Sequence, residues 1–149
     1  MELVHIGSEK KTKGEPIIVY KNREELLKSL EEWKHRLYLD SWTIAVGYHS
    51  AGEHENECGH VDFLEDKQTA KISLLKPWVN NRITKHSQEE TLVHELLHLK
   101  IGFIIPSDSI EGMFYDIMQH RLIDELAHAL VNAKYGTDRV WWYNDDRCR

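Results

Sequence analysis

Apolar residues recur at the period of an α-helix in two long segments of the chain. The first segment begins after Asn22, a candidate N-cap residue, and has acidic residues in its first turn. The second covers about residues 111–135, and Gly136 marks its end, since glycine is favoured just after a helix. Its apolar stripe consists of Phe114, Ile117, Met118, Leu122, Leu126, Ala129, Leu130 and Ala133. We expect two amphipathic helices that bury these apolar faces.

Capping residues predict a further helix between these two. Ser87, with Glu90 three positions later, forms a capping box, in which each side chain accepts a hydrogen bond from an N–H group at the helix start. Gly102 lies where a C-cap glycine belongs, so this helix should cover about residues 88–101. The pentapeptide HELLH, residues 94–98, lies in its middle.

Short segments rich in β-branched and aromatic residues predict a small sheet. Residues 41–49, 58–65 and 69–76 show partial alternation and are separated by turn-prone polar stretches, so we expect three antiparallel strands. LVHI and PIIVY, within residues 1–21, suggest an N-terminal hairpin or a pro-segment, and residues 137–149 form an aromatic tail. The prediction is an α+β fold with a small, mostly antiparallel sheet.

Length and composition restrict the function classes. The 149 residues suit a single domain over residues 1–149, and the net charge of -6 argues against nucleic acid as a partner. No segment approaches the roughly 20 apolar residues that span a bilayer, and no secretory signal is visible at the start. Cys58 and Cys148 do not form a disulfide framework, which fits a reducing compartment. We therefore expect a cytoplasmic protein.

HELLH is the motif most directly linked to chemistry. His94 and His98 are four residues apart, so on a helix both imidazoles project from one face and can reach a single Zn²⁺. Glu95 lies beside the first histidine, where it can take a proton from a zinc-bound water and deliver it to a leaving amine. A buried helix with two hydrogen-bonded histidines is the alternative, but three clustered polar groups would then all need partners. We favour the zinc site.

Residues 54–60, HENECGH, are a second cluster of potential metal ligands. Their polar, glycine-bearing context also suits a hairpin loop, and we favour the loop.

On these residues the chain resembles the zincin metallopeptidases, and most closely their compact gluzincin-like members, including minigluzincins and ImmA/IrrE-type peptidases. The match covers roughly residues 24–135, with TLVHELLHLKIG at its centre. The resemblance implies a backing helix, an HExxH active-site helix, a second helix that carries an acidic zinc ligand, and hydrolysis of peptide bonds. It also implies that TAKISLLK, residues 69–76, is the sheet-edge strand that aligns an extended peptide or protein substrate.

The third zinc ligand should come from the helix at 111–135. The longer metzincin pattern is excluded, because it requires Gly and His where this chain has Ile101 and Ile104. Ligand candidates on the later helix are His120, Asp124, Glu125 and His128. We expect Glu125, because it shares a helix face with Met118, Leu122 and Ala129 and would point inward.

Other roles on this helix stay open. Asp124 is either the alternative ligand or the group that orients a histidine. Thermolysin-like gluzincins carry a carboxylate four residues after the ligand, where this chain has Ala129. A peptidase needs a donor for the oxyanion, and we take His120 as the catalytic candidate, with His128, Tyr115 and Tyr135 as alternatives. A rival hypothesis is a zincin-like binding or regulatory module whose metal site is structural or lost.

Overall fold

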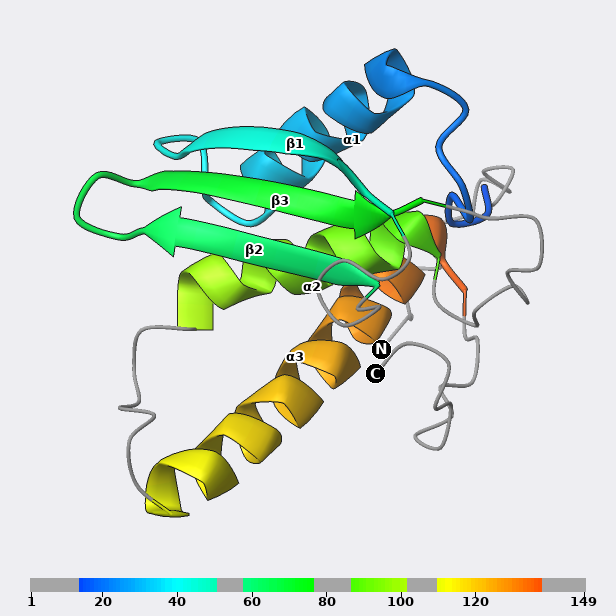
Figure 1. The fold of residues 1–149 in the computed structure, drawn as a ribbon. Helices are drawn as coiled ribbons and strands as arrows, with labels where there is room; N and C mark the ends of the chain where they lie inside the picture. The colour runs from blue at the N-terminus through cyan, green and yellow to red at the C-terminus, as the bar shows by residue number, and fades with distance from the viewer. Residues whose placement is uncertain (1–13, 51–57, 77–86, 102–109, 138–149) are drawn as a thin grey trace, which may run out of the picture.

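The computed structural model describes residues 14–50, 58–76, 87–101 and 110–137. Six elements follow one another along the chain: α1 (Arg23–Arg36), β1 (Thr43–His49), β2 (Gly59–Leu64), β3 (Thr69–Leu75), α2 (Gln88–Ile101) and α3 (Ile110–Tyr135). The α+β class, the three helices and the positions of the three strands are as the sequence predicts. Helix α2 is central, because it contacts α1, α3 and the strands β2 and β3 (Figure 1).

The sheet is mixed and has the strand order β1-β3-β2. Strands β2 and β3 form an antiparallel hairpin, as expected, and Gln68 in their connection has a positive φ of 48°. Strand β1 pairs with β3 in parallel, with Thr43 opposite Thr69, so the prediction of three antiparallel strands is wrong for this pair. Composition and alternation indicate a strand but carry no information on the direction of its neighbour.

The strand order also corrects the expected peptide-binding strand. Strand β3, which contains most of TAKISLLK, is the central strand, and both of its edges are paired with neighbours. The edge strand that contacts α2 is β2.

Helix α2 begins and is buried as its sequence indicates. The Ser87 hydroxyl accepts a hydrogen bond of 2.9 Å from the Glu90 N–H, which confirms the Ser87 half of the predicted capping box. The Glu90 carboxylate contacts His128 on α3. The apolar side chains of α2 form much of the hydrophobic core: Leu92, Val93, Leu96, Leu97 and Leu99. This burial fixes the orientation of the helix, so the histidines of HELLH project away from the core.

The segment PIIVY is not a strand. Residues 16–20 are irregular, and the carbonyl groups of Ile17 and Ile18 accept hydrogen bonds from the N–H groups of Glu89 and Gln88. The segment thus supplies acceptors for N–H groups at the start of α2 that have no partner inside the helix. The hairpin partner expected before residue 14 lies outside the described residues.

Helix α3 buries a different face from the one predicted. Its buried side chains are Ile123, Ala127 and Val131, whereas the large apolar residues of the predicted stripe are exposed: Phe114, Ile117, Met118, Leu122 and Leu126. Helix α3 has 26 residues and α2 has 14, so the N-terminal part of α3 extends beyond the helix that it packs against (Figure 1). Helix α3 carries both apolar and polar residues, and its packing against the rest of the domain decides which face is buried.

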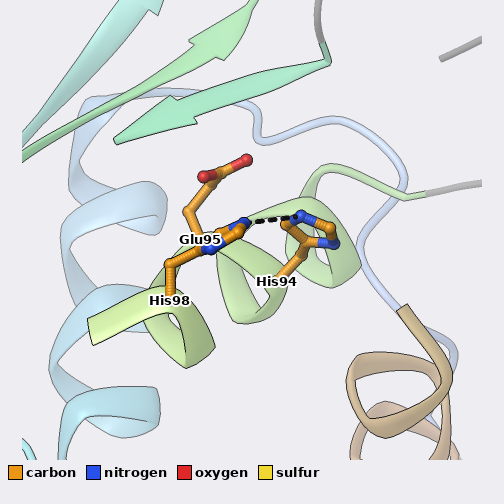
Figure 2. A group of neighbouring side chains, drawn as sticks. All are labelled: His94, Glu95 and His98. Carbon is orange, nitrogen blue, oxygen red and sulfur yellow. Dashed lines mark hydrogen bonds between the residues drawn. The ribbon is translucent and has the colours of Figure 1, made fainter. Parts of the chain in front are cut away.

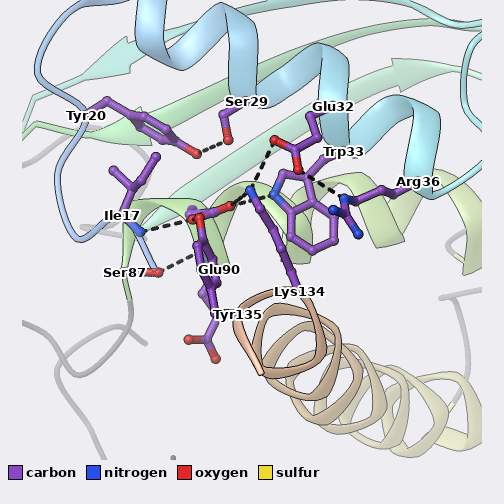
Figure 3. A network of polar contacts seen from close by, with 11 residues as sticks. Ile17, Tyr20, Ser29, Glu32, Trp33, Arg36, Ser87, Glu90, Lys134 and Tyr135 are labelled. Atoms are coloured by element: carbon purple, nitrogen blue, oxygen red, sulfur yellow. Dashed lines mark hydrogen bonds and ion pairs between the residues drawn. The ribbon is translucent and has the colours of Figure 1, made fainter. Parts of the chain in front are cut away.

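A buried polar network joins α3 to the rest of the domain (Figure 3). Glu89 on α2 is fully buried and accepts hydrogen bonds from Trp33 on α1, from Lys134 and Tyr135 on α3, and from the Ile17 N–H group. Burial by itself would raise the pKa of Glu89, but these hydrogen bonds lower the pKa below its ordinary value. The network therefore holds a charged carboxylate at the junction of all three helices.

Two observations bear on the expectations about disulfides and membrane spans. Cys58 is disulfide-bonded, which does not fit the reducing compartment that the sequence suggests. Among the described residues, no helix combines the length and the apolar character needed to cross a membrane. Gly102, the first four residues of HENECGH and residues 138–149 of the aromatic tail lie outside the described residues.

Candidate functional site

The two histidines of HELLH point toward one another on the side of α2 that faces α3, where both are partly buried. The Nε2 atoms of His94 and His98 are 3.1 Å apart, and the ring centroids are 4.9 Å apart (Figure 2). Two nitrogens bound to one tetrahedral Zn²⁺ at about 2.0–2.1 Å are about 3.3 Å from each other. The separation in the structure is therefore close to that of two ligands of a shared zinc ion.

The environment of His98 keeps its imidazole neutral. Burial, together with the neighbouring rings of His94 and His120, lowers the pKa of His98 to about 3, against a smaller opposing effect of Asp124. A neutral imidazole has a lone pair on one ring nitrogen, which is the form that binds metal. The site thus offers a ligand without first releasing a proton at neutral pH.

Glu95 is buried and faces the sheet, whereas the histidines do not. Its carboxylate extends toward the strands (Figure 2), and one of its oxygens lies within 4.8 Å of the ligand atoms of both His94 and His98. Gly59, the first residue of β2, lies directly against it, because a Cβ atom at Gly59 would be 2.6 Å from Glu95 Oε1. The absence of a side chain at Gly59 therefore makes the room that the carboxylate occupies.

Helix α3 brings three polar residues to the same side of α2. Oδ1 of Asp124 is 2.6 Å from Nδ1 of His94. One turn earlier, the ring of His120 lies 4.9 Å from that of His98, and one turn later His128 contacts Glu90 at 2.7 Å. The two helices are thus joined by a polar ladder of three rungs, His98–His120, His94–Asp124 and Glu90–His128.

The spacing of the ladder follows from helix geometry. Its members are four residues apart on each helix, so they form one row along each surface. From one rung to the next, the residue numbers increase on α2 and decrease on α3. The two rows therefore run antiparallel. The four-residue spacing within each row is visible in the sequence. Which residue of one row pairs with which residue of the other depends on how the two helices dock.

Glu125 is not brought to the site. Its side chain is 48% exposed and forms an ion pair of 3.2 Å with Arg121. Consecutive helical residues differ by about 100° in direction, so Asp124 and Glu125 cannot both face α2. The expectation that Glu125 points inward is wrong, because Met118 and Leu122, which share its face, are exposed.

The structure also distinguishes among the predicted oxyanion donors. His128 and Tyr135 are engaged by Glu90 and Glu89, and the side chain of Tyr115 lies outside the description. His120 is the candidate that lies beside the HELLH histidines, with ring centroids 6.3 Å from His94 and 4.9 Å from His98. Sequence reasoning missed Gly59, since nothing in the local pattern links a strand glycine to a carboxylate on α2.

Comparisons with known proteins identify no relative. No family model matches the chain, and neither the curated proteins nor the solved structures contain a match.

Proposed function

We propose that the protein is a zinc-dependent hydrolase of peptide bonds. The observation that carries this proposal is the cluster of His94, Glu95 and His98, whose ligand atoms all lie within 4.8 Å of one another. Two imidazoles with facing Nε2 atoms match the ligand types that Zn²⁺ prefers, and a third group from α3 would complete the usual set of three. Zn²⁺ bound there would lower the pKa of a water molecule and polarise a substrate carbonyl.

Glu95 supplies the proton transfers in this proposal. Its carboxylate is close to both histidines but is held on the sheet side by the space at Gly59, so it can act without being a ligand. From there it takes a proton from the attacking water and returns it to the leaving amine. Its burial keeps bulk water away from the carboxylate, which strengthens its interaction with a positive charge nearby.

An extended peptide is the substrate that the sheet suits. Strand β2 is an edge strand that contacts α2, and Gly59 at its start adjoins Glu95. A peptide that adds to the edge of β2 would form main-chain hydrogen bonds and would pass the HELLH face of α2. Main-chain pairing of this kind is tolerant of side-chain identity, so we expect selection by backbone shape more than by one residue type.

The rival is a binding module, and one observation favours it. The polar ladder satisfies the histidines without a metal, because the His94 Nδ1–H group donates to Asp124 and the His98 Nε2–H group can donate to His94. Such a ladder would be a purely structural contact between α2 and α3.

Glu95→Gln separates the two functions. The substitution retains the size of the side chain but removes its basicity, so the variant should fold and bind zinc like wild type. Cleavage of a broad peptide library should fall by about a hundredfold or more, the usual range for a lost general base. Equal rates for wild type and variant, or no cleavage by zinc-loaded wild type, would reject the peptidase and leave the binding module.

A further inference from the structure

The position of Asp124 decides which group on α3 can reach a shared metal. Its carboxylate contacts Nδ1 of His94, whereas Nε2 of the same ring faces His98. The two nitrogens lie on different edges of the imidazole, so a metal held by both Nε2 atoms is on the far side of the ring from Asp124. A carboxylate at Nδ1 fixes the tautomer and direction of a metal-binding histidine and is not itself a ligand.

His120 is the imidazole on α3 that lies beside the ring of His98. Its ring centroid is 4.9 Å from that of His98, the same separation as between His94 and His98. Its Nδ1 is 2.9 Å from the Asp116 carbonyl oxygen, which can only accept, so Nδ1 carries the proton. With the proton on Nδ1, Nε2 is the ring atom that is left to bind a metal.

The ring of His120 would have to move to share a metal ion with both histidines of HELLH. Its centroid is 6.3 Å from that of His94, which is longer than the other two separations, so the ring must move toward His94 to complete a tetrahedral set. The side chain is 49% exposed, and its Nδ1 also lies 3.5 Å from Oδ1 of Asp116 on the same helix. The remaining acidic and imidazole candidates are held elsewhere, Glu125 by Arg121 and His128 by Glu90.

We propose that His120 is the third zinc ligand and that Asp124 is a positioning residue for His94. This inference rests on the proposed function, since it concerns the same metal. It assigns a site of three imidazoles in place of the two imidazoles and one carboxylate that the resemblance implies. The charge of Asp124 then acts through the His94 ring, which becomes a stronger electron donor to the metal.

X-ray absorption of the zinc-loaded protein tests the assignment, because imidazole and carboxylate ligands differ in their scattering. Wild type should show three imidazoles, His120→Ala two, and Asp124→Ala three. Competition with a chelator should show zinc affinity falling most in His120→Ala, and by about 10–100-fold in Asp124→Ala, the usual cost of losing an outer partner. Glu125→Ala, the matched carboxylate control one residue away, should bind zinc like wild type.

The outcomes separate this inference from the proposed function. Two imidazoles in wild type, with a carboxylate signal that disappears in Asp124→Ala, would overturn the ligand assignment and leave the peptidase intact. Three imidazoles without peptide cleavage would support the assignment and reject the peptidase. Absence of zinc binding by wild type rejects both. Should His120→Ala fail to fold by circular dichroism, the imidazole count in wild type and Asp124→Ala still decides between the ligands.

Discussion

His94 on α2 and Asp124 on α3 form the middle rung of the polar ladder, with 2.6 Å between Nδ1 and Oδ1. This contact directs the opposite nitrogen of His94 toward His98, and so it determines how the HELLH histidines face one another. The two residues are 30 positions apart in the chain. The geometry of the candidate metal centre therefore depends on the docking of α3 as much as on the motif itself.

Removing either histidine of HELLH should abolish zinc binding. We expect about one Zn²⁺ per chain in wild type and a large loss of occupancy in His94→Ala and His98→Ala, because each lacks one ligand. Elemental analysis of protein purified without added zinc measures this directly. His35→Ala is the matched control, since His35 is an exposed histidine on α1. Equal zinc content in all four proteins would refute the site.

Gly59→Ala should impair cleavage without removing zinc. The added Cβ atom would lie 2.6 Å from Glu95 Oε1 and 2.7 Å from Thr91 Cγ2, so the carboxylate must shift from its position. We expect the rate of peptide cleavage to fall at least about tenfold, a part of the usual contribution of a general base. Zinc content should be unchanged, since the side chains that the new Cβ atom would meet, Glu95 and Thr91, are not proposed zinc ligands.

Gly47→Ala is the control for the glycine substitution. Gly47 is also a strand residue, on β1, and a Cβ atom there would meet nothing within 4 Å. Its cleavage rate should stay close to that of wild type. If both alanine variants cleave at the same rate, the contact between Gly59 and Glu95 has no catalytic consequence.

Breaking the Glu90–His128 rung should weaken the attachment of α3 to α2. The two side chains are 4% and 13% exposed and are 2.7 Å apart, so their interaction is poorly screened by solvent. A double-mutant cycle with Glu90→Gln and His128→Asn should give a coupling free energy of about 1 kcal/mol or more in urea unfolding. The exposed Arg121–Glu125 pair, tested in the same way, should give only about 0.3–0.5 kcal/mol.

Glu89→Gln should destabilise the whole domain. The substitution leaves Lys134 and its partners around an uncharged group, and breaking a buried ion pair from one side costs about 3–5 kcal/mol. The free energy of unfolding in urea measures the loss. Glu31→Gln, which alters an ion pair with Lys34 in which Glu31 is exposed, should change stability by less than about 1 kcal/mol.

The Glu89 network also predicts an acid dependence of stability. Because the pKa of Glu89 is lower in the folded state, its contribution is present above the unfolded value of about 4.3 and is lost as the pH falls through the folded value. Wild type should therefore lose stability on acidification over this range more steeply than Glu89→Gln does. Parallel curves for the two proteins would show that Glu89 is not the group responsible.

The sequence by itself determined the local features of this protein. Capping residues and apolar spacing predicted the bounds of α2 and its Ser87 cap, and short alternating segments predicted the strands, because these features depend on neighbours a few residues away. The spacing within HELLH likewise predicted that His94 and His98 share one helix face, and the structure confirms this. Each of these conclusions requires only the geometry of a single element.

Only the tertiary structure decided which surfaces of those elements meet. Helix α3 has apolar residues on more than one face, so periodicity could not distinguish the stripe containing Leu122 from the one containing Ile123, and packing against α2 buries Ile123. That choice turns Asp124 toward His94 and leaves Glu125 with Arg121. The parallel pairing of β1 and the position of β2 at the sheet edge were decided in the same way, by contacts between segments whose separate patterns do not specify their partners.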